Sequence, residues 1–329
     1  MPGIWTPANF KHPMADILFI KTSSLGDVVH HMPALTEARA HRPDARFAWV
    51  VEEAFAPLVR LHPAVREVIP VSLRRWRGSL SAPATWAEML RFRQALRSRR
   101  FDAVIDTQGL VKSALVTRSA RGQRHGYDAH SIKERFASHF YDVRHPVEWK
   151  QHAVARNRAL TAAALGYTPE GPPDYGLDRA RIAQTTAAPY AVLLHATARP
   201  GKQWPEDNWR ALATALSPNI DLVLPWGSDA EHESSVRIAS GVARTRVPEK
   251  RPLDDVARLI AGASFVVGVD TGLLHLAAAL GVPLVAIFAG SEPELTGPMG
   301  RGPLAVVGTQ GSPPSVETVM EAVERIRPR

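Results

Sequence analysis

The fold of this chain is decided by residues 263–288, ASFVVGVDTGLLHLAAALGVPLVAIF. Two apolar runs rich in β-branched residues, ASFVVGV and VPLVAIF, enclose a short helical pattern, an order typical of a β–α–β unit in a buried parallel sheet. The overlapping window 271–291 contains no charged residue and has the length of a membrane helix. Within it, however, Gly281 and Pro283 separate the helical pattern from the second apolar run. The sequence therefore predicts a buried helix followed by a buried strand.

Similar pairs of strand-length and helix-length patterns recur along the chain. The strand-length runs lie at 15–21, 45–51, 65–71 and 101–107, and then at 190–196, 220–226, 263–269 and 282–288. A Pro/Gly-rich stretch at 167–177 separates the two sets. We therefore expect an α/β protein with two Rossmann-like, doubly wound domains that face a cleft.

The expected domains are residues 1–170 and residues 171–313. The last segment, about 314–329, contains the candidate N-cap Ser315 and is typical of a closing helix, which we expect to pack back on the first domain. The first residues lack the basic stretch and apolar run of a secretory signal, which predicts a cytoplasmic protein.

Composition limits the possible chemistry. The chain has 329 residues, enough for two domains of roughly 150 residues each. It contains no cysteine, which excludes disulfides, iron–sulfur clusters, cysteine zinc sites and a thiol nucleophile. We expect neither a metal nor a cofactor.

The net charge of +8 is concentrated in one half of the chain. Residues 1–164 carry 25 basic and 14 acidic side chains, whereas residues 165–329 carry 15 and 18. A basic first half indicates an anionic partner. Nucleic acid is not favoured, because the sequence has no helix-turn-helix, RNP-type or zinc-finger pattern and its second half is acidic.

A turn of small residues follows the first strand-length run, and Asp27 lies at the mouth of the next helix. Pro33 predicts that the regular helix begins only around His31. The carboxylate of Asp27 either caps the free N–H groups of the helix or faces a cleft at the carboxyl end of the sheet as a general base. The residues alone leave both interpretations open.

In the second half, the run 263–269 is followed by Asp270, Thr271 and Gly272, and then by a helix. The backbone N–H groups, the hydroxyl of Thr271 and the helix dipole at this turn can hold a diphosphate. A carboxylate repels such an anion, so we expect Asp270 to fix the turn. His275, one turn into the helix, either packs against its neighbours or points into the phosphate site.

Two more loops follow strand-length runs of the second half. HATARPGKQWP (195–205) contains Lys202, which is either a solvated side chain or a cation that neutralises phosphate. LPWGSDAEHE (224–233) contains Glu231, which either stabilises the first turn of a helix or accepts hydrogen bonds from a ribose.

Together, KTSSLGDVVHHMPAL, RRWR, DTQGLVKSA, HATARPGKQWP, LPWGSDAEHE and VGVDTGLLHLAAALGVPLVAIF resemble the ADP-heptose:lipopolysaccharide heptosyltransferases of glycosyltransferase family 9. The resemblance covers residues 15–295 in the family's order and is closer to the enzymes that add the first heptose of the inner core. The chain departs from the family's pattern at AGSEPELTGP, which includes the 291–296 loop.

The resemblance implies a GT-B fold and an inverting, metal-independent transfer of L-glycero-D-manno-heptose from ADP-heptose to a Kdo residue of Kdo2-lipid A. It implies that the first domain binds the acceptor and the second the donor. Asp27 matches the family's proposed catalytic base, and Lys202 matches the lysine that contacts the donor phosphates. The implied donor-binding set is Ser24, Thr197, Lys202, Trp226, Glu231, Asp270, Thr271, Gly272 and His275.

Kdo2-lipid A carries carboxylates and phosphates, which fits the basic first half. The candidate acceptor contacts are Arg60, Arg74, Arg75, Arg77, Lys112, Arg121 and Lys133. The RRWR run interleaves Trp76 with arginines, so we expect it at the headgroup level of a membrane. The protein is then in peripheral contact with the inner leaflet of the cytoplasmic membrane.

Other activities remain open. A heptosyltransferase that adds the second heptose shares these motifs, and a GT-B-like nucleotide-sugar epimerase shares the nucleotide site without a basic acceptor face. A dinucleotide-dependent dehydrogenase needs G-x-G-x-x-G in its first turn, whereas TSSLGD has a single glycine.

Overall fold

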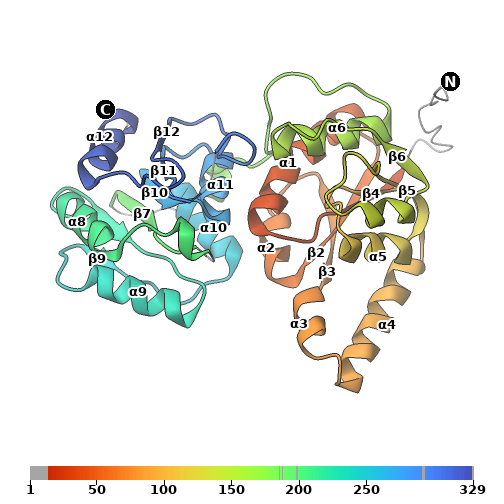
Figure 1. The fold of residues 1–329 in the computed structure, drawn as a ribbon, viewed down its shortest axis with the longest axis horizontal. Coiled ribbons are helices and arrows are strands. Elements are labelled where there is room, and N and C mark those ends of the chain that lie inside the picture. The colour runs from red at the N-terminus through yellow and green to blue at the C-terminus, as the bar shows by residue number, and fades with distance from the viewer. Residues whose placement is uncertain (1–13, 185, 187, 198, 291–292, 328–329) are drawn as a thin grey trace. The chain divides into compact units, whose positions relative to one another are not determined.

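The computed structural model describes the chain except residues 1–13, 185, 187, 198, 291–292 and 328–329. The chain divides into two compact units, Met1–Gly176 and Leu177–Arg329, called here the first and second domains (Figure 1). Each unit contains a six-stranded sheet, and every strand pair in it is parallel. The change of unit falls inside the Pro/Gly-rich stretch 167–177. The predicted α/β class with two doubly wound sheets is confirmed.

The first sheet has the strand order β3-β2-β1-β4-β5-β6. Its strands are β1 (Asp16–Ile20), β2 (Arg46–Glu52), β3 (Val65–Val71), β4 (Arg100–Asp106), β5 (Arg121–Tyr127) and β6 (Val143–His145). The α-helices of this domain are α1 (Leu25–His41), α2 (Ala56–Val59), α3 (Leu73–Gly78), α4 (Pro83–Arg97), α5 (Val111–Ser119) and α6 (Ala153–Leu165), with 3-10 turns at Glu53–Phe55 and Arg135–Phe140.

The second sheet has the strand order β12-β11-β10-β7-β8-β9. Its strands are β7 (Tyr190–Leu194), β8 (Asp221–Val223), β9 (Thr245–Arg246), β10 (Phe265–Val269), β11 (Leu284–Ile287) and β12 (Leu304–Val307). The helices are α7 (Arg179–Ile182), α8 (Glu206–Leu216), α9 (Asp229–Ala239), α10 (Leu253–Gly262), α11 (Gly272–Ala279) and α12 (Val316–Ile326), with a 3-10 turn at Pro200–Lys202.

Both sheets have the same topology. Counted from its own first strand, each follows the order 3-2-1-4-5-6 of a doubly wound nucleotide-binding fold. The strand order reverses between β1 and β4 in the first domain, and between β7 and β10 in the second. Ligands of such sheets bind outside the carboxyl ends of the strands at this reversal. The fold therefore gives each domain one preferred ligand-binding position.

Helix α12 packs within the second domain. Its residues Val319, Ala322, Val323 and Ile326, spaced three or four apart, are buried in one core cluster with side chains of β10, β11 and α8. The prediction that the closing helix packs back on the first domain is wrong, because its apolar face is already covered by its own sheet.

Helix α1 is regular from Leu25 to His41 and contains Pro33. The expectation that it begins only around His31 is therefore wrong. A proline inside a helix removes one backbone hydrogen bond and crowds the preceding turn. Here Val28, Met32 and Leu35 are fully buried, and this packing outweighs the local cost.

The structure also bears on the charge-free window 271–291. In the described part of the chain, no helix is long and apolar enough to cross a membrane. The window holds α11 and β11 on either side of Gly281 and Pro283, as the sequence predicts.

Candidate active site

In the first domain, the turn after β1 is held by the turn after β4. Asp106, fully buried at the end of β4, accepts a hydrogen bond from the backbone N–H of Gln108 at 2.8 Å. The side-chain oxygen of Gln108 accepts hydrogen bonds from the N–H groups of Thr22 and Ser23, both at 3.1 Å. These hydrogen bonds thus hold the backbone of the turn that leads to Asp27, at the point where the strand order reverses.

Asp27 caps helix α1 with one of its carboxylate oxygens. Its Oδ2 accepts hydrogen bonds from the N–H of Ser24 at 2.8 Å and from the hydroxyl of Ser24 at 3.0 Å. Among the described residues, no hydrogen bond is recorded for Oδ1, and the side chain is partly exposed. Asp27 can therefore cap the helix and accept a proton from a ligand at the same time.

Positive charge lies around this carboxylate. Lys21 is buried and donates to the carbonyl oxygen of Thr107 at 2.8 Å and to Asn157 at 3.3 Å. Burial lowers the pKa of Lys21, and the negative charge of Asp27 partly opposes that shift. Lys112 donates to the hydroxyl of Ser23 at 2.8 Å and interacts electrostatically with Asp27.

Several of the predicted acceptor residues surround this edge of the first sheet. Arg74 and Lys112 interact electrostatically, as do Arg77 and Lys112. Lys133 is exposed in the loop after β5, and its positive charge contributes to the lowered pKa of Lys21. Arg60 is exposed at the end of α2. Four basic side chains, Arg74, Arg77, Lys112 and Lys133, therefore make the carboxyl edge attractive to anions.

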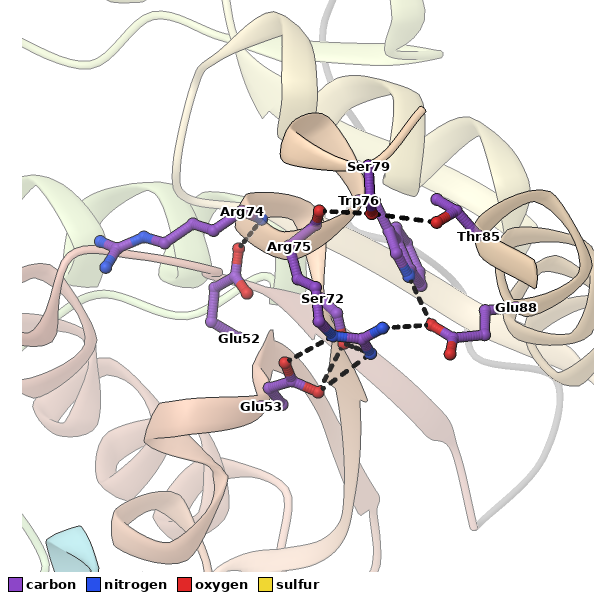
Figure 2. A network of polar contacts seen from close by, with 9 residues as sticks. All are labelled: Glu52, Glu53, Ser72, Arg74, Arg75, Trp76, Ser79, Thr85 and Glu88. Atoms are coloured by element: carbon purple, nitrogen blue, oxygen red, sulfur yellow. Dashed lines mark hydrogen bonds and ion pairs between the residues drawn. The ribbon is translucent and has the colours of Figure 1, made fainter. Parts of the chain in front are cut away.

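Arg75 and Trp76 take part in a network of polar contacts within the first domain (Figure 2). The guanidinium of Arg75 pairs with Glu53 at 3.3 Å and with Glu88 at 2.8 Å. Trp76 is only 6% exposed, and its indole N–H donates to the same Glu88 at 2.9 Å. This network ties α3 to α4, so the placement of Trp76 at the headgroup level of a membrane is wrong.

Arg121 lies away from the predicted acceptor residues. It is the first residue of β5 and is paired in register with Arg100, the first residue of β4. Both therefore lie at the amino edge of the parallel sheet, whereas Asp27 follows the carboxyl end of β1. Arg121 therefore lies at the opposite edge of the sheet from Asp27, and its contact with the acceptor stays a prediction.

In the second domain, Lys202 and Asp270 form an ion pair between the loop after β7 and the end of β10. The other oxygen of Asp270 lies 3.5 Å from Nε2 of His275. The hydroxyl of Thr197 donates to the backbone carbonyl oxygen of Asp270 at 3.3 Å. Asp270 thus holds together a lysine, a histidine and a threonine at the reversal point of the sheet.

Helix α11 begins at the same place. Thr271 is its N-cap and makes no side-chain cap hydrogen bond, and Gly272 is the first helical residue. The first N–H groups of a helix have no partner within the helix and attract anions. Together with Lys202 and His275, these amides form a cradle suited to a diphosphate.

Glu231 and Trp226 lie on the loop after β8. Oε2 of Glu231 accepts hydrogen bonds from the N–H groups of Gly227 at 2.7 Å and Ser228 at 3.2 Å, which caps α9. The indole of Trp226 donates to the carbonyl oxygen of Pro248 at 2.7 Å, and its ring lies 4.4 Å from that of His232. The capping role predicted for Glu231 is therefore confirmed, and Trp226 offers a flat surface beside it.

A cavity of about 720 Å³ joins two of these loops. It is lined by Thr197 and Glu231 from the predicted set and by His195, Glu206 and Arg237, which the sequence did not single out. Burial lowers the pKa of His195 to about 4, so this imidazole is neutral near pH 7. Glu206 and Arg237 are paired, a contact that the spacing of 31 residues does not reveal.

The 291–296 loop, where the chain departs from the family's pattern, includes residues 291 and 292, which lie outside the described residues. No contact of Ser291 is therefore assigned.

Two doubly wound domains, one with a partly open carboxylate and the other with an anion cradle at its reversal point, define a glycosyltransferase of the GT-B class. The family model of glycosyltransferase family 9 (heptosyltransferase) matches residues 89–322. This chain belongs to glycosyltransferase family 9, the heptosyltransferases.

Known relatives agree with this family assignment. The chain is 47% identical over 290 residues to lipopolysaccharide heptosyltransferase 1 of Escherichia coli K12, covering 87% of this chain and 91% of the relative. It is 26% identical over 318 residues to lipopolysaccharide heptosyltransferase 2 of Salmonella typhimurium, covering 86% and 85%. The solved structure of E. coli heptosyltransferase WaaC with ADP matches with a TM-score of 0.88 at 44% identity, covering 94% and 99%.

Proposed function

We propose that this enzyme transfers L-glycero-D-manno-heptose from ADP-heptose to a Kdo residue of Kdo2-lipid A, with inversion at the anomeric carbon. The observation that carries the proposal is that each domain has a site suited to one substrate. The first has a carboxylate oxygen of Asp27 without a recorded hydrogen bond among the described residues, and the second has an anion-binding site at Lys202, His275 and the start of α11. The higher identity to heptosyltransferase 1 than to heptosyltransferase 2 favours the first heptose over the second.

The donor is bound by the second domain. The α11 amides and Lys202 hold the two phosphates, and His275 lies one helical turn away. Glu231 has one oxygen outside its cap hydrogen bonds for the ribose, and Trp226 lies next to it for the base. As the bond between the anomeric carbon and the phosphate oxygen breaks, these groups stabilise the negative charge on ADP.

The acceptor is activated by the first domain. Oδ1 of Asp27 accepts the proton of the acceptor hydroxyl while the hydroxyl oxygen attacks the anomeric carbon from the face opposite ADP. One carboxylate is enough, because the reaction forms no covalent glycosyl-enzyme intermediate. Arg74, Arg77, Lys112 and Lys133 attract the carboxylates and phosphates of the acceptor.

The acceptor also locates the enzyme. Kdo2-lipid A is anchored in a bilayer by its acyl chains, so an enzyme that acts on it must reach the membrane surface. We therefore propose that this protein works in the cytoplasm, in peripheral contact with the inner leaflet of the cytoplasmic membrane.

The test is a transfer assay with purified enzyme, ADP-heptose and Kdo2-lipid A, followed by mass spectrometry and by NMR of the new anomeric centre. We expect one added heptose with inverted configuration. Transfer only to an acceptor that already carries one heptose would assign the second step instead. Conversion of ADP-heptose without any acceptor would identify an epimerase, and binding of a different nucleotide sugar in place of ADP-heptose would contradict the donor.

A further inference from the structure

Helix α4 has two faces of opposite character. Its inward face carries Thr85, Met89, Phe92 and Leu96, which are buried or pack against the core of the first domain. Its outward face follows the same helical spacing with Trp86, Leu90, Arg93 and Arg97. The first two of these side chains are apolar yet 52% and 56% exposed. Among the described residues of this domain, none covers these two large apolar side chains, which are therefore in contact with water.

Helix α5 continues this surface. It contacts α4, next to which it lies in Figure 1. It presents Leu115, which is 51% exposed, and the exposed Arg118. A hollow of about 580 Å³ between the two helices is lined by Arg93, Arg97, Leu115 and Arg118, together with Ser119 and Arg124. The α4–α5 face is defined here as Trp86, Leu90, Arg93, Arg97, Leu115 and Arg118.

The charge of the α4–α5 face is not neutralised locally. In the described part of the chain, no ion pair is recorded for Arg93, Arg97 or Arg118. Arg121 adds a fourth cation, because its guanidinium donates to the backbone carbonyl oxygen of Arg97 at 3.5 Å. Like charges held this close repel each other unless an anion lies among them. The face therefore complements a partner that is both anionic and apolar.

We propose that the α4–α5 face docks on an anionic phospholipid bilayer. Arginines bind the lipid phosphates, while Trp86, Leu90 and Leu115 enter the boundary between headgroups and acyl chains. The indole N–H of Trp86 donates to the carbonyl oxygen of Leu80 at 2.9 Å, which satisfies its polar group and leaves the ring for the lipid. A second copy of this face is a poor partner, because it carries the same positive charge.

The proposal rests on the proposed function in one respect: a lipid-anchored acceptor gives the enzyme a reason to bind a bilayer. The proposal assigns the contact with the membrane to the α4–α5 face, whose apolar side chains are exposed, in place of the RRWR run at 74–77. The chain continues directly from α3, which carries Arg74 and Arg77, into α4. Docking along α4 therefore keeps acceptor-binding side chains beside the membrane.

The first test measures vesicle binding by co-sedimentation. We expect the full-length protein to bind vesicles of phosphatidylethanolamine and phosphatidylglycerol, and to bind phosphatidylcholine vesicles weakly. The triple variant Arg93→Gln, Arg97→Gln, Arg118→Gln should lose about 100-fold in partition to the anionic vesicles. The matched control removes the same charge from exposed positions of the second domain, Arg181→Gln, Arg251→Gln and Arg325→Gln, and should bind like the wild type.

The second test separates apolar insertion from simple charge attraction. The double variant Leu90→Gln, Leu115→Gln should weaken anionic-vesicle binding by about tenfold or more, whereas Val236→Gln, Val306→Gln on the second domain should not. The proposal is overturned if the wild type does not bind anionic vesicles, if either face variant binds as well as its control, or if a nucleic acid duplex binds the face more tightly than the vesicles do.

Transfer of heptose to acceptor dispersed in detergent distinguishes this proposal from the proposed function. The arginine and leucine variants of the face should keep that activity and lose only vesicle binding. If the wild type binds vesicles through the α4–α5 face, so that the face variants lose binding, but transfers no heptose, the proposed function fails and the docking surface stands. If transfer is normal but vesicle binding does not depend on the face, the docking surface fails alone.

Discussion

Asp27 and Glu231 occupy the same position in two different helices. Each is the third residue of its helix, and each gives one oxygen to the N–H of the N-cap serine, Ser24 or Ser228. Among the described residues, no hydrogen bond is recorded for the other oxygen of either carboxylate. The capping and the ligand-binding interpretations of such a residue are therefore compatible, because a carboxylate has enough lone pairs for both.

Asp27→Asn is expected to lower turnover by at least about 100-fold with little change in ADP affinity. The amide oxygen of asparagine can still accept the hydrogen bonds of Ser24, so the helix cap is kept, but the side chain cannot take up a proton. Steady-state transfer kinetics and calorimetric ADP binding check this. Turnover near the wild-type value would show that Asp27 is not the base.

Lys202→Ala is expected to weaken ADP binding by about tenfold or more. The substitution removes a cation and leaves the carboxylate of Asp270, 7% exposed, facing the diphosphate, so attraction is replaced by repulsion. Lys202→Arg keeps the charge and serves as the control in the same calorimetric titration. A variant that binds ADP normally and differs only in thermal stability would remove Lys202 from the donor site.

At the scale of elements, α3 shows how a sequence pattern can mislead. Three arginines and one tryptophan within the four residues 74–77 are typical of a membrane-facing segment. In the structure, Trp76 is buried and packs edge-on against Phe92, with ring centroids 5.6 Å apart. Arg75 pairs with Glu53 and Glu88 (Figure 2). The exposed tryptophan of this region is Trp86, on the next helix.

Trp76→Ala should lower the free energy of unfolding by about 3–5 kcal/mol, because it creates a cavity between α3 and α4. Trp76→Phe keeps an aromatic ring but loses the pyrrole part of the indole and its hydrogen bond to Glu88, so a smaller loss of about 1–3 kcal/mol is expected. Urea unfolding followed by circular dichroism measures both. The control is Trp86→Ala, which should change stability by no more than about 0.5 kcal/mol. Equal losses at Trp76 and Trp86 would contradict the burial of Trp76.

The elements that sequence reasoning found and missed differ in their burial. All eight predicted strand-length runs contain a strand. Runs such as 16–20 and 265–269 are recognisable because they are buried and form continuous apolar segments, whereas β3 is largely half-buried or exposed and is recognisable from its β-branched residues. The polar sequence RGQRHGY of β5 is not a continuous apolar segment, and its first four residues are exposed or half-buried. The edge strand β9 is only two residues long. Side-chain placement, as for Arg121 and Trp76, depends on register and helix rotation, which local sequence does not fix.

At the scale of the whole molecule, buried histidines are distributed unevenly between the two domains. Burial lowers the pKa of His62, His125 and His145 from 6.5 to about 4 and holds that of His31 well below 6.5, all in the first domain. In the second domain, burial lowers the pKa of His195 to about 4. His125 and His145 stack with their ring centroids 5.4 Å apart, so a proton on one opposes a proton on the other.

The first domain should therefore lose stability in acid before the second. Between about pH 6.5 and 4, the unfolded chain binds protons that the folded histidines do not, so the free energy of unfolding falls by up to about 1.4 kcal/mol per pH unit for each histidine. Burial raises the pKa of Glu52 and Asp106, which acts in the opposite sense, but the histidines outnumber them.

Domain-resolved hydrogen exchange at a series of pH values checks this order of unfolding. Amides of the first sheet should lose protection at higher pH than those of the second. The variant His195→Gln is the control, because it removes the shifted histidine of the second domain and should leave the acid response of the first domain unchanged. Simultaneous loss of protection in both sheets would contradict the prediction.

In the proposed donor site, the carboxylate of Asp270 and the phosphates of the donor compete for the ammonium of Lys202. A carboxylate fixed beside the ammonium acts as a tethered competitor, present at a high effective concentration whatever the composition of the solution. We therefore expect a diphosphate, which also binds the α11 amides, to displace this carboxylate more readily than a singly charged anion such as chloride does. On the proposed function, a negative charge inside the anion-binding site would thus favour the donor over the many small anions of a cell.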